Sequence, residues 1–390
     1  MVNLKEDLKE KIRSDIIKAK PNAPRKLNAE FKKIAGLISL TIGEPDFNQP
    51  ELVKKSMIKA IKENDSHYST ARGNLAFRKA ASNFLKRHFG LNYDPEKEII
   101  TTVGTTEAIF SSLSTILKDG DELLIPSPVY PLYGQAAYVN HAKVVYIPTN
   151  NSNFVLTPKK LLKALKNHPK AVGIVLTYPN NPTGVEYTFD QLKDLSHVIK
   201  KYNLFVLSDE IYSSFNYVGK HISIAKFIPE QTILVNGVSK SYAMTGARIG
   251  FAAAPADLIS QIVKIHQYAI TAVADVPMAG ATKAFNDGDQ EIDRMRQIYL
   301  KRRNYLIPQL KKIGFGVAAP DGAFYLFLKI PREQNQNDVD FARELAYKAK
   351  VGLTPGSYYG KGGEGYLRLS YAASDEKLHE AIERLSNYLK

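Results

Sequence analysis

One lysine in the middle of the chain lies among small residues. Lys240 follows a short apolar run, Thr232 to Val235, that is typical of a buried strand. A lysine withdrawn from water loses its proton more readily, so its amine can attack a carbonyl carbon. Arg248 follows within the same small-residue stretch and presents a donor fork suited to a phosphate or a carboxylate. The stretch indicates a nucleophile beside an anion site; the alternative is a basic surface loop.

A second anion site is predicted after the β-branched run 99–103. Gly104, Thr105 and Thr106 follow this run and open an apolar helix that extends to Leu117. The first N–H groups of a helix have no partner within the helix, and they point at any anion placed there. The threonine hydroxyls add donors. Capped helices after strands are common, so the pattern by itself is only moderately specific.

Two further polar groups follow predicted buried strands. Asn181 lies in the turn 179–184 after the strand 172–176, and Asp209 ends the strand that begins near Leu204, three residues before Tyr212. Open α/β sheets bind ligands at the carboxyl ends of their strands. A buried acid there needs a cationic or hydrogen-bonding partner. The alternatives are a plain turn at Asn181, a surface aspartate and a core tyrosine.

Two more side chains are held rigidly by their surroundings in the sequence. Arg368 stands alone among apolar residues in a predicted strand, where an inward arginine is costly unless an anion meets it. Three prolines in 126–131 leave Tyr130 little freedom. Gly43, in the loop after the apolar run 37–42, allows close approach of a ligand to the backbone.

Strands and helices alternate through the middle of the chain, which predicts βαβ units and a mainly parallel sheet. The 390 residues, 44% of them hydrophobic, are enough for a large core. The absence of cysteine excludes disulfides and thiolate metal sites. No apolar run is long enough to cross a bilayer, and a cytoplasmic location fits best. We interpret the net charge of +14 as favouring anionic small molecules over nucleic acid.

The residues from Gly237 to Gly250 resemble the pyridoxal-phosphate lysine signature of the class I and II aminotransferases. The resemblance covers essentially the whole chain from Gly43 onward and is strongest to the aromatic amino acid branch. It implies that Lys240 carries pyridoxal 5'-phosphate as a Schiff base and that Asp209 keeps the pyridine nitrogen protonated. Tyr212 would donate to the phenolic oxygen of the cofactor.

The same resemblance implies the contacts to the cofactor phosphate. They come from the lysine stretch and from the predicted turn before the helix, and the residues are Ser239, Arg248, Gly104, Thr105 and Thr106. Two positions depart from the usual pattern: Gly237 replaces a frequent serine and Ala247 a frequent tryptophan. We expect both to affect phosphate grip or local packing rather than the chemistry.

The resemblance also implies how the ring and the substrate are held. Tyr130 would stack on the pyridine, and Asn181 would contact both the phenolic oxygen and the substrate carboxylate. The main chain of Gly43 would face the substrate, and Arg368 would clamp its α-carboxylate in a bidentate pair. Tyr68, in the loop 67–73, matches a residue that crosses the dimer interface to the neighbouring cofactor.

The implied fold is the α/β fold of type I pyridoxal-phosphate enzymes, with a mixed, mainly parallel seven-stranded sheet and a small α+β domain. We expect an N-terminal arm and part of the small domain in 1–49, the large domain in 50–285 and the small C-terminal domain in 286–390. The implied assembly is a homodimer with shared active sites, with no nucleic-acid or membrane partner. A helix predicted over 4–17, with Leu4, Leu8, Ile12 and Ile16 on one face, would dock on its own or the partner subunit rather than on a membrane.

The implied reaction moves the amino group of an L-amino acid to a 2-oxo acid such as 2-oxoglutarate. No second arginine stands in a motif suited to a distal carboxylate, so we expect an aromatic or large apolar donor. The alternatives are an N-acetyl-diaminopimelate-type aminotransferase and a carbon–sulfur β-lyase. A cofactor-binding regulator is a further alternative, but few residues precede the first strand to hold a DNA-binding module.

Overall fold

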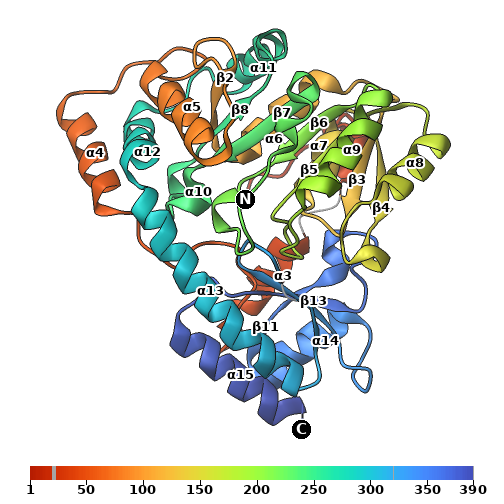
Figure 1. Cartoon of the computed structure of the whole chain (residues 1–390). Coiled ribbons are helices and arrows are strands. Elements are labelled where there is room, and N and C mark those ends of the chain that lie inside the picture. The colour runs from red at the N-terminus through yellow and green to blue at the C-terminus, as the bar shows by residue number, and fades with distance from the viewer. Residues whose placement is uncertain (20–22, 319, 390) are drawn as a thin grey trace.

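The computed structural model describes residues 1–19, 23–318 and 320–389, and these form two units along which the long helix α13 runs (Figure 1). The upper unit in this view contains a seven-stranded sheet, and the lower unit contains a four-stranded sheet. Residues from the beginning and the end of the chain meet in the lower unit, because β1 (Ile38–Ser39) pairs in parallel with β11 (Val351–Gly352). The limits of the predicted domains stay a proposal.

The large sheet confirms the predicted mixed and mainly parallel arrangement. Its strand order is β2-β8-β7-β6-β5-β3-β4, and β8 is antiparallel to both of its neighbours while the other pairs are parallel. Its strands are β2 (Ile99–Val103), β3 (Glu122–Ser127), β4 (Lys143–Pro148), β5 (Ala171–Thr177), β6 (Phe205–Asp209), β7 (Thr232–Gly237) and β8 (Ile249–Ala253).

Both faces of this sheet are buried, which explains why its strands are continuous apolar runs. Successive side chains of a strand point to opposite faces, so Val206 and Leu207 of β6 enter two different hydrophobic clusters. One face carries α6 (Gly104–Ile116), α7 (Leu132–Val139) and α11 (Ala256–Ala269). The other carries α4 (Glu51–Lys62), α5 (Leu75–Phe89), α8 (Pro158–Asn167), α9 (Phe189–Lys201) and α12 (Asp275–Asp287).

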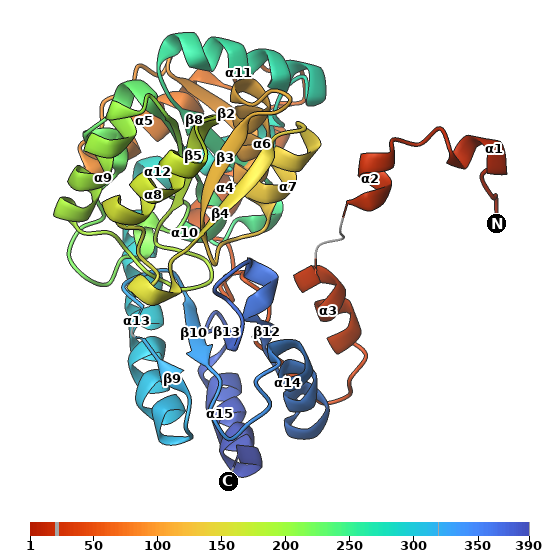
Figure 2. The ribbon, with the colours of Figure 1, turned by 90° about the vertical axis from the view of Figure 1, so that its right-hand side faces the viewer.

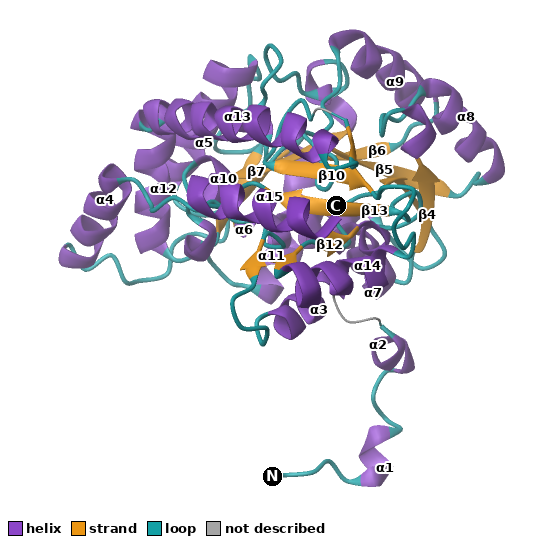
Figure 3. Cartoon of the chain, turned by 90° about the horizontal axis from the view of Figure 1, so that it is seen from below, coloured by secondary structure: helices purple, strands orange, loops and turns teal. Residues whose placement is uncertain are grey.

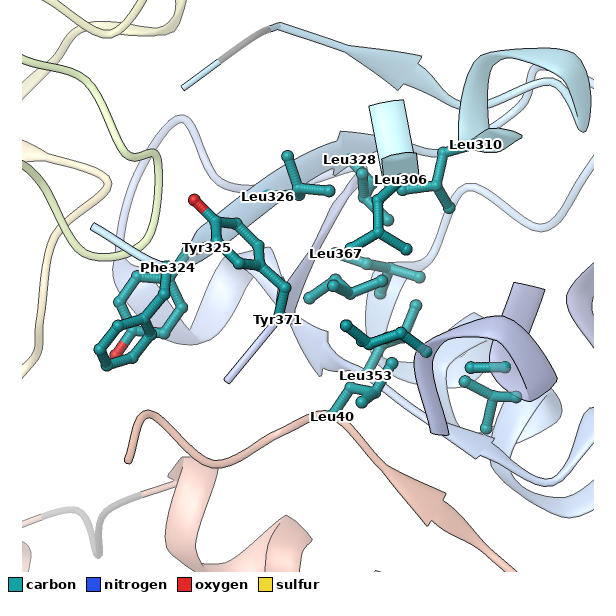
Figure 4. Close-up of a cluster of buried hydrophobic side chains, with 14 of the residues drawn as sticks. Leu40, Leu306, Leu310, Phe324, Tyr325, Leu326, Leu328, Leu353, Leu367 and Tyr371 are labelled. Atoms are coloured by element: carbon teal, nitrogen blue, oxygen red, sulfur yellow. The ribbon is translucent and has the colours of Figure 1, made fainter. Parts of the chain in front are cut away.

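The small sheet is antiparallel, with the order β12-β13-β10-β9. Leucines and aromatic side chains of its strands pack with Leu306 and Leu310 of α13 and with Leu40 from the N-terminal segment (Figure 4). The strands of this sheet are β9 (Gly316–Val317), β10 (Tyr325–Lys329), β12 (Thr354–Pro355) and β13 (Tyr366–Ser370). The helices beside it are α13 (Asp289–Lys312), α14 (Asp338–Glu344) and α15 (Asp375–Leu389). The helix α3 (Ala23–Phe31) lies beside α14 and β12 (Figure 2).

The N-terminal arm differs from the continuous helix predicted over 4–17. It forms two short helices, α1 (Glu6–Lys9) and α2 (Ser14–Lys18), and it projects away from the body of the chain (Figures 2 and 3). The predicted apolar stripe remains exposed, with Leu8 at 43% and Ile12 at 44%. Short helices are marginal without a surface to pack on, which explains the break. The end of the arm contacts α7, where the Tyr138 hydroxyl donates to the Asp15 carbonyl oxygen at 3.0 Å.

Within the described ranges, no helix combines the length and the apolar character needed to cross a bilayer. In the same residues, no group of three or more His, Cys, Asp or Glu side chains is arranged to hold a metal ion.

Candidate active site

A cavity of about 360 Å³ lies between the two units, at the carboxyl ends of β5, β6 and β7. It brings together all but two of the side chains and loops predicted from the sequence. Those that line it are Gly43, Thr105, Thr106, Tyr130, Asn181, Asp209, Tyr212, Ser239, Lys240, Arg248 and Arg368. Gly104 lies directly behind this lining, against Arg248. Tyr68 lies outside the cavity.

Lys240 lies on the short helix α10 (Val238–Ser241), which begins where β7 ends. Its Nζ donates a hydrogen bond to the carbonyl oxygen of Gly43 at 2.7 Å, which fixes the amine across the cavity from its own strand. Burial lowers the pKa of Lys240 to about 8; the charge of Glu44 opposes this change and those of Arg248 and Arg368 add to it. A substantial neutral fraction is therefore present near neutral pH, as a nucleophile or base requires.

Asp209 ends β6 and is held by two donors. Its Oδ2 accepts from the Tyr133 hydroxyl at 2.7 Å, and its Oδ1 accepts from the Ile211 N–H at 3.1 Å. Burial raises the pKa of Asp209 to about 6, although both hydrogen bonds oppose the rise. A carboxylate in such a place is stabilised by a cation, so it suits a protonated ring nitrogen.

The phosphate site predicted at the start of α6 has a backbone that admits little but glycine. Gly104 has φ of +70°, and a Cβ there would lie 2.6 Å from Nη2 of Arg248. A Cβ on Gly250 would lie 2.7 Å from the Thr105 nitrogen. Val103, the N-cap, contributes no side-chain hydrogen bond to the helix start. The close packing sets the Arg248 guanidinium beside the N-terminal N–H groups of α6, and both favour an anion.

Arg368 of β13 forms the opposite side of the cavity. Its Nη1 donates to Oδ1 of Asn181 at 2.9 Å, and its Nη2 donates to the carbonyl oxygen of Thr41. The guanidinium lies between the rings of Tyr325 and Tyr359, with its Cζ 4.5 and 5.1 Å from their centroids. Its buried Nε has no hydrogen-bond partner among the described residues. A donor left in this state suits a carboxylate ligand.

Sequence reasoning missed four residues of this cavity. Tyr133 holds Asp209, and Tyr325 shares a hydrogen bond of 2.7 Å with the hydroxyl of Tyr212. Tyr359 lies against Arg368, and Arg25 of α3 lines the cavity from the N-terminal segment. Arg25 stands in no motif that the sequence analysis associated with a distal carboxylate, but it lies in the cavity lining. The proline-rich loop before Tyr133 and the alternating aromatic strand around Tyr325 were signals in the sequence, but nothing local distinguished Arg25.

Tyr68 lies in the loop before α5 and is 90% exposed. Within one chain it contacts nothing in the cavity lining that the structure describes, and its contact with a neighbouring subunit stays a prediction.

The family model for aminotransferase class I and II matches residues 35–385. The chain is 42% identical to the probable N-acetyl-LL-diaminopimelate aminotransferase of Bacillus subtilis, over 90% of this chain and 89% of that protein. It is 39% identical to aromatic-amino-acid aminotransferase 2 of Thermococcus litoralis, over 95% of this chain and 96% of that protein. Its structure is similar to that of the aspartate aminotransferase from Thermus thermophilus with maleate, with a TM-score of 0.90 and 31% identity. The similarity covers 96% of this chain and 99% of that chain.

Proposed function

This chain belongs to the class I and II aminotransferases, and we propose that it moves the amino group of an aromatic or large apolar L-amino acid to 2-oxoglutarate. The chain is a pyridoxal 5'-phosphate enzyme whose substrates are amino acids and 2-oxo acids. The family match favours transamination over the β-lyase and regulator alternatives. We also propose a homodimer with shared active sites and a cytoplasmic location.

The observed cavity fits pyridoxal 5'-phosphate. The cradle of Gly104, Thr105 and Arg248 has no room for a Cβ but leaves donors for a phosphate. Asp209, Lys240 and Tyr130 all line this cavity. When bound, the cofactor supplies a carbonyl carbon for the substrate amine and a conjugated ring that accepts the charge released at Cα. We assign the phosphate to Arg248, Ser239 and the start of α6, and the ring nitrogen to Asp209.

Lys240 and Asp209 handle the protons in the mechanism that we propose. The neutral amine of Lys240 would take a proton from the substrate Cα and return it to the carbonyl carbon of the cofactor. Asp209 would keep a proton on the ring nitrogen of the bound cofactor, and the Tyr133 hydroxyl orients this carboxylate. Tyr212, coupled to Tyr325, supplies a hydroxyl at the same wall.

Arg368 and Asn181 orient the substrate. Arg368 and Asn181 line the cavity side by side and are joined by a hydrogen bond, so together they offer the α-carboxylate two adjacent partners that would set the rotation about Cα. The tyrosines on both sides of the guanidinium exclude water from this pair, which strengthens its electrostatic interaction.

The apolar wall of the cavity supports the proposed donor class. Ile42, Ile109, Leu132 and Tyr130 line it, and each methylene buried there contributes about 0.8 kcal/mol. The relative from Thermococcus litoralis is named for aromatic amino acids, in agreement with such a pocket. The relative from Bacillus subtilis favours a second candidate donor, an N-acetylated diaminopimelate, whose long polar chain would extend past this wall.

A competition assay separates these donors. The holoenzyme is incubated with 2-oxoglutarate and either phenylalanine, leucine, aspartate or N-acetyl-LL-diaminopimelate, and kcat/KM is measured for each. We expect phenylalanine and leucine to exceed aspartate at least about tenfold, because two or more extra buried carbons correspond to roughly that factor. A preference for aspartate or for the acetylated compound would overturn the proposed donor class.

A further inference from the structure

The rim of the cavity is formed by α3. Pro24, Arg25 and Asn28 line the cavity from this helix, opposite Ile109 and Leu132. Arg25 is exposed to solvent, whereas the cavity side chains at the strand ends are largely buried. Figure 1 shows α3 near the place where the two units meet. The rim thus places a cation at the cavity that no motif in the sequence marked.

The charges of the lining leave one arginine beyond the proposed ligands. Among the described residues that line the cavity, the cations are Arg25, Lys240, Arg248 and Arg368, and the acid is Asp209. The proposed function assigns Arg248 to the cofactor phosphate, Arg368 to the α-carboxylate and Lys240 to the chemistry. A dicarboxylic substrate such as 2-oxoglutarate brings one more anionic group, and the distal position of that group requires a cation away from Arg368.

The charge of Arg25 acts inside the cavity. Burial raises the pKa of Tyr130, and the positive charge of Arg25 opposes that rise more than the charges of Arg248 and Arg368 do. Both residues line the same cavity, so the charge of Arg25 is felt at the phenol of Tyr130. Tyr130 is a member of the apolar wall, so Arg25 stands where the far end of a substrate side chain would lie.

A hydrogen-bonded chain fixes α3 relative to the α-carboxylate clamp. Asn28 lies three residues after Arg25, on the same face of α3, and its Oδ1 accepts from the Thr41 hydroxyl at 3.0 Å. The carbonyl oxygen of Thr41 accepts in turn from Arg368. The two arginines are therefore carried by elements that share a partner, and they face one cavity from two directions.

We propose that Arg25 binds the distal carboxylate of a dicarboxylic substrate, 2-oxoglutarate in one half of the reaction and glutamate in its reverse. This inference rests on the proposed function, since it takes Arg368 as the α-carboxylate site. The planar fork of arginine suits a bidentate pair with a carboxylate. Its exposure matters as well, because an exposed charge need not be desolvated when an aromatic side chain is bound.

The experiment compares dicarboxylic with monocarboxylic ligands in the holoenzyme and in Arg25→Gln. Single-turnover kinetics are measured with 2-oxoglutarate and with phenylalanine, and the equilibrium binding of glutarate and of butyrate is followed by the cofactor absorbance. We expect Arg25→Gln to lower kcat/KM for 2-oxoglutarate and the affinity for glutarate by roughly 10- to 100-fold, as loss of a charged hydrogen bond implies. Phenylalanine and butyrate should change by less than about threefold.

Two variants serve as matched controls. Lys26→Gln removes an exposed charge from the next position of α3 and should leave all four ligands unchanged. Arg25→Lys keeps the charge but not the fork, so it should restore part of the glutarate affinity.

Equal losses for phenylalanine and 2-oxoglutarate, or no loss for glutarate, would overturn the role of Arg25. A wild-type enzyme that binds glutarate no better than butyrate would also overturn it. If the wild type fails to use 2-oxoglutarate, the proposed acceptor is wrong. The glutarate and butyrate titrations then still decide whether Arg25 reads a distal carboxylate, so the two failures are distinguishable.

Discussion

The inner wall of the cavity and its rim are built differently. On the inner wall, Asp209 accepts two hydrogen bonds from buried partners, and Arg368 donates two to buried partners. At the rim, Arg25 lies exposed on a helix of nine residues. Tyr68 lies outside the cavity, exposed in a loop. The inner wall can therefore hold its groups to a narrow range of positions, whereas the rim can change side chains at small cost in stability. We infer that the chemistry resides in the first region and the choice of substrate in the second.

The strongest test of the inner wall is removal of the nucleophile. Lys240→Ala should lower kcat by about 10⁴-fold or more, because both covalent attachment and proton transfer at Cα are lost. The measurement is turnover together with borohydride reduction and peptide mapping of the wild-type holoenzyme. A reduced adduct on a lysine other than Lys240 would contradict the assignment.

Asp209→Asn should lower kcat by about 10³-fold, because an amide cannot hold the ring nitrogen protonated.

In the cofactor-free protein, Asp209→Asn should instead raise the free energy of unfolding. Its buried carboxyl has a pKa of about 6 instead of the ordinary 3.8, so ionisation is costlier in the folded state. The wild type therefore loses up to about 3 kcal/mol of unfolding free energy as pH rises from 4 through 6, and the asparagine variant does not.

Urea unfolding of both cofactor-free proteins at pH 4 and pH 8 measures this difference. The two proteins should differ little in stability at pH 4, where the folded carboxyl is protonated and the unfolded one is only partly ionised. At pH 8 the variant should be the more stable. A variant that is less stable at both pH values would mean that the carboxylate contributes to folding rather than opposing it.

Tyr133→Phe tests how tightly the inner wall is fixed. The substitution removes the donor at 2.7 Å from Asp209 and leaves the ring packing in place. We expect a loss of roughly 10- to 100-fold in kcat/KM, as for a hydrogen bond to a charged group. The hydroxyl also lowers the pKa of Asp209, so in the cofactor-free variant this carboxyl should titrate at higher pH. Tyr130→Phe, in the same wall, is the control and should leave that titration unchanged.

The inner wall could be predicted from the sequence to a greater extent than the rim. Asn181, Asp209 and Lys240 follow strands directly, so a linear pattern places them at one edge of the sheet. The partners of these residues arise from tertiary packing: Tyr212 and Tyr325 meet although 113 residues separate them. No local signal marks such a pair. Arg25 was missed for the same reason, since its place depends on how the N-terminal segment packs beside β12 and α14.

Helical periodicity also misled where packing decides, and packing gives a reason for one departure from the family pattern. The 4–17 stripe has helical spacing, but without a surface to cover it breaks into two short helices. Gly237 was interpreted as the loss of a phosphate donor. A Cβ there would lie 2.8 Å from the Cα of Gly250, so close approach of β7 and β8 leaves no room for one. The glycine is required by the sheet, whatever its effect on phosphate binding.

The smallest effect is expected outside the cavity, from Tyr68→Phe. The tyrosine is 90% exposed in one chain, and we predict that it donates to the cofactor phosphate of the neighbouring subunit. Loss of one such bond should lower kcat/KM by about tenfold.

Mixed dimers sharpen this prediction, because they separate a contact within a chain from one between chains. In a dimer of one Lys240→Ala and one Tyr68→Phe subunit, a contact between subunits leaves one complete site: the second subunit supplies Lys240 and the first supplies Tyr68. A contact within the chain leaves no complete site. With a tenfold defect in Tyr68→Phe, a re-equilibrated one-to-one mixture should be about fivefold more active than the two proteins assayed separately and added. If the activity equals that sum although heterodimers are verified by mass, Tyr68 acts on the active site of its own chain. The residues of each site would then all come from a single subunit.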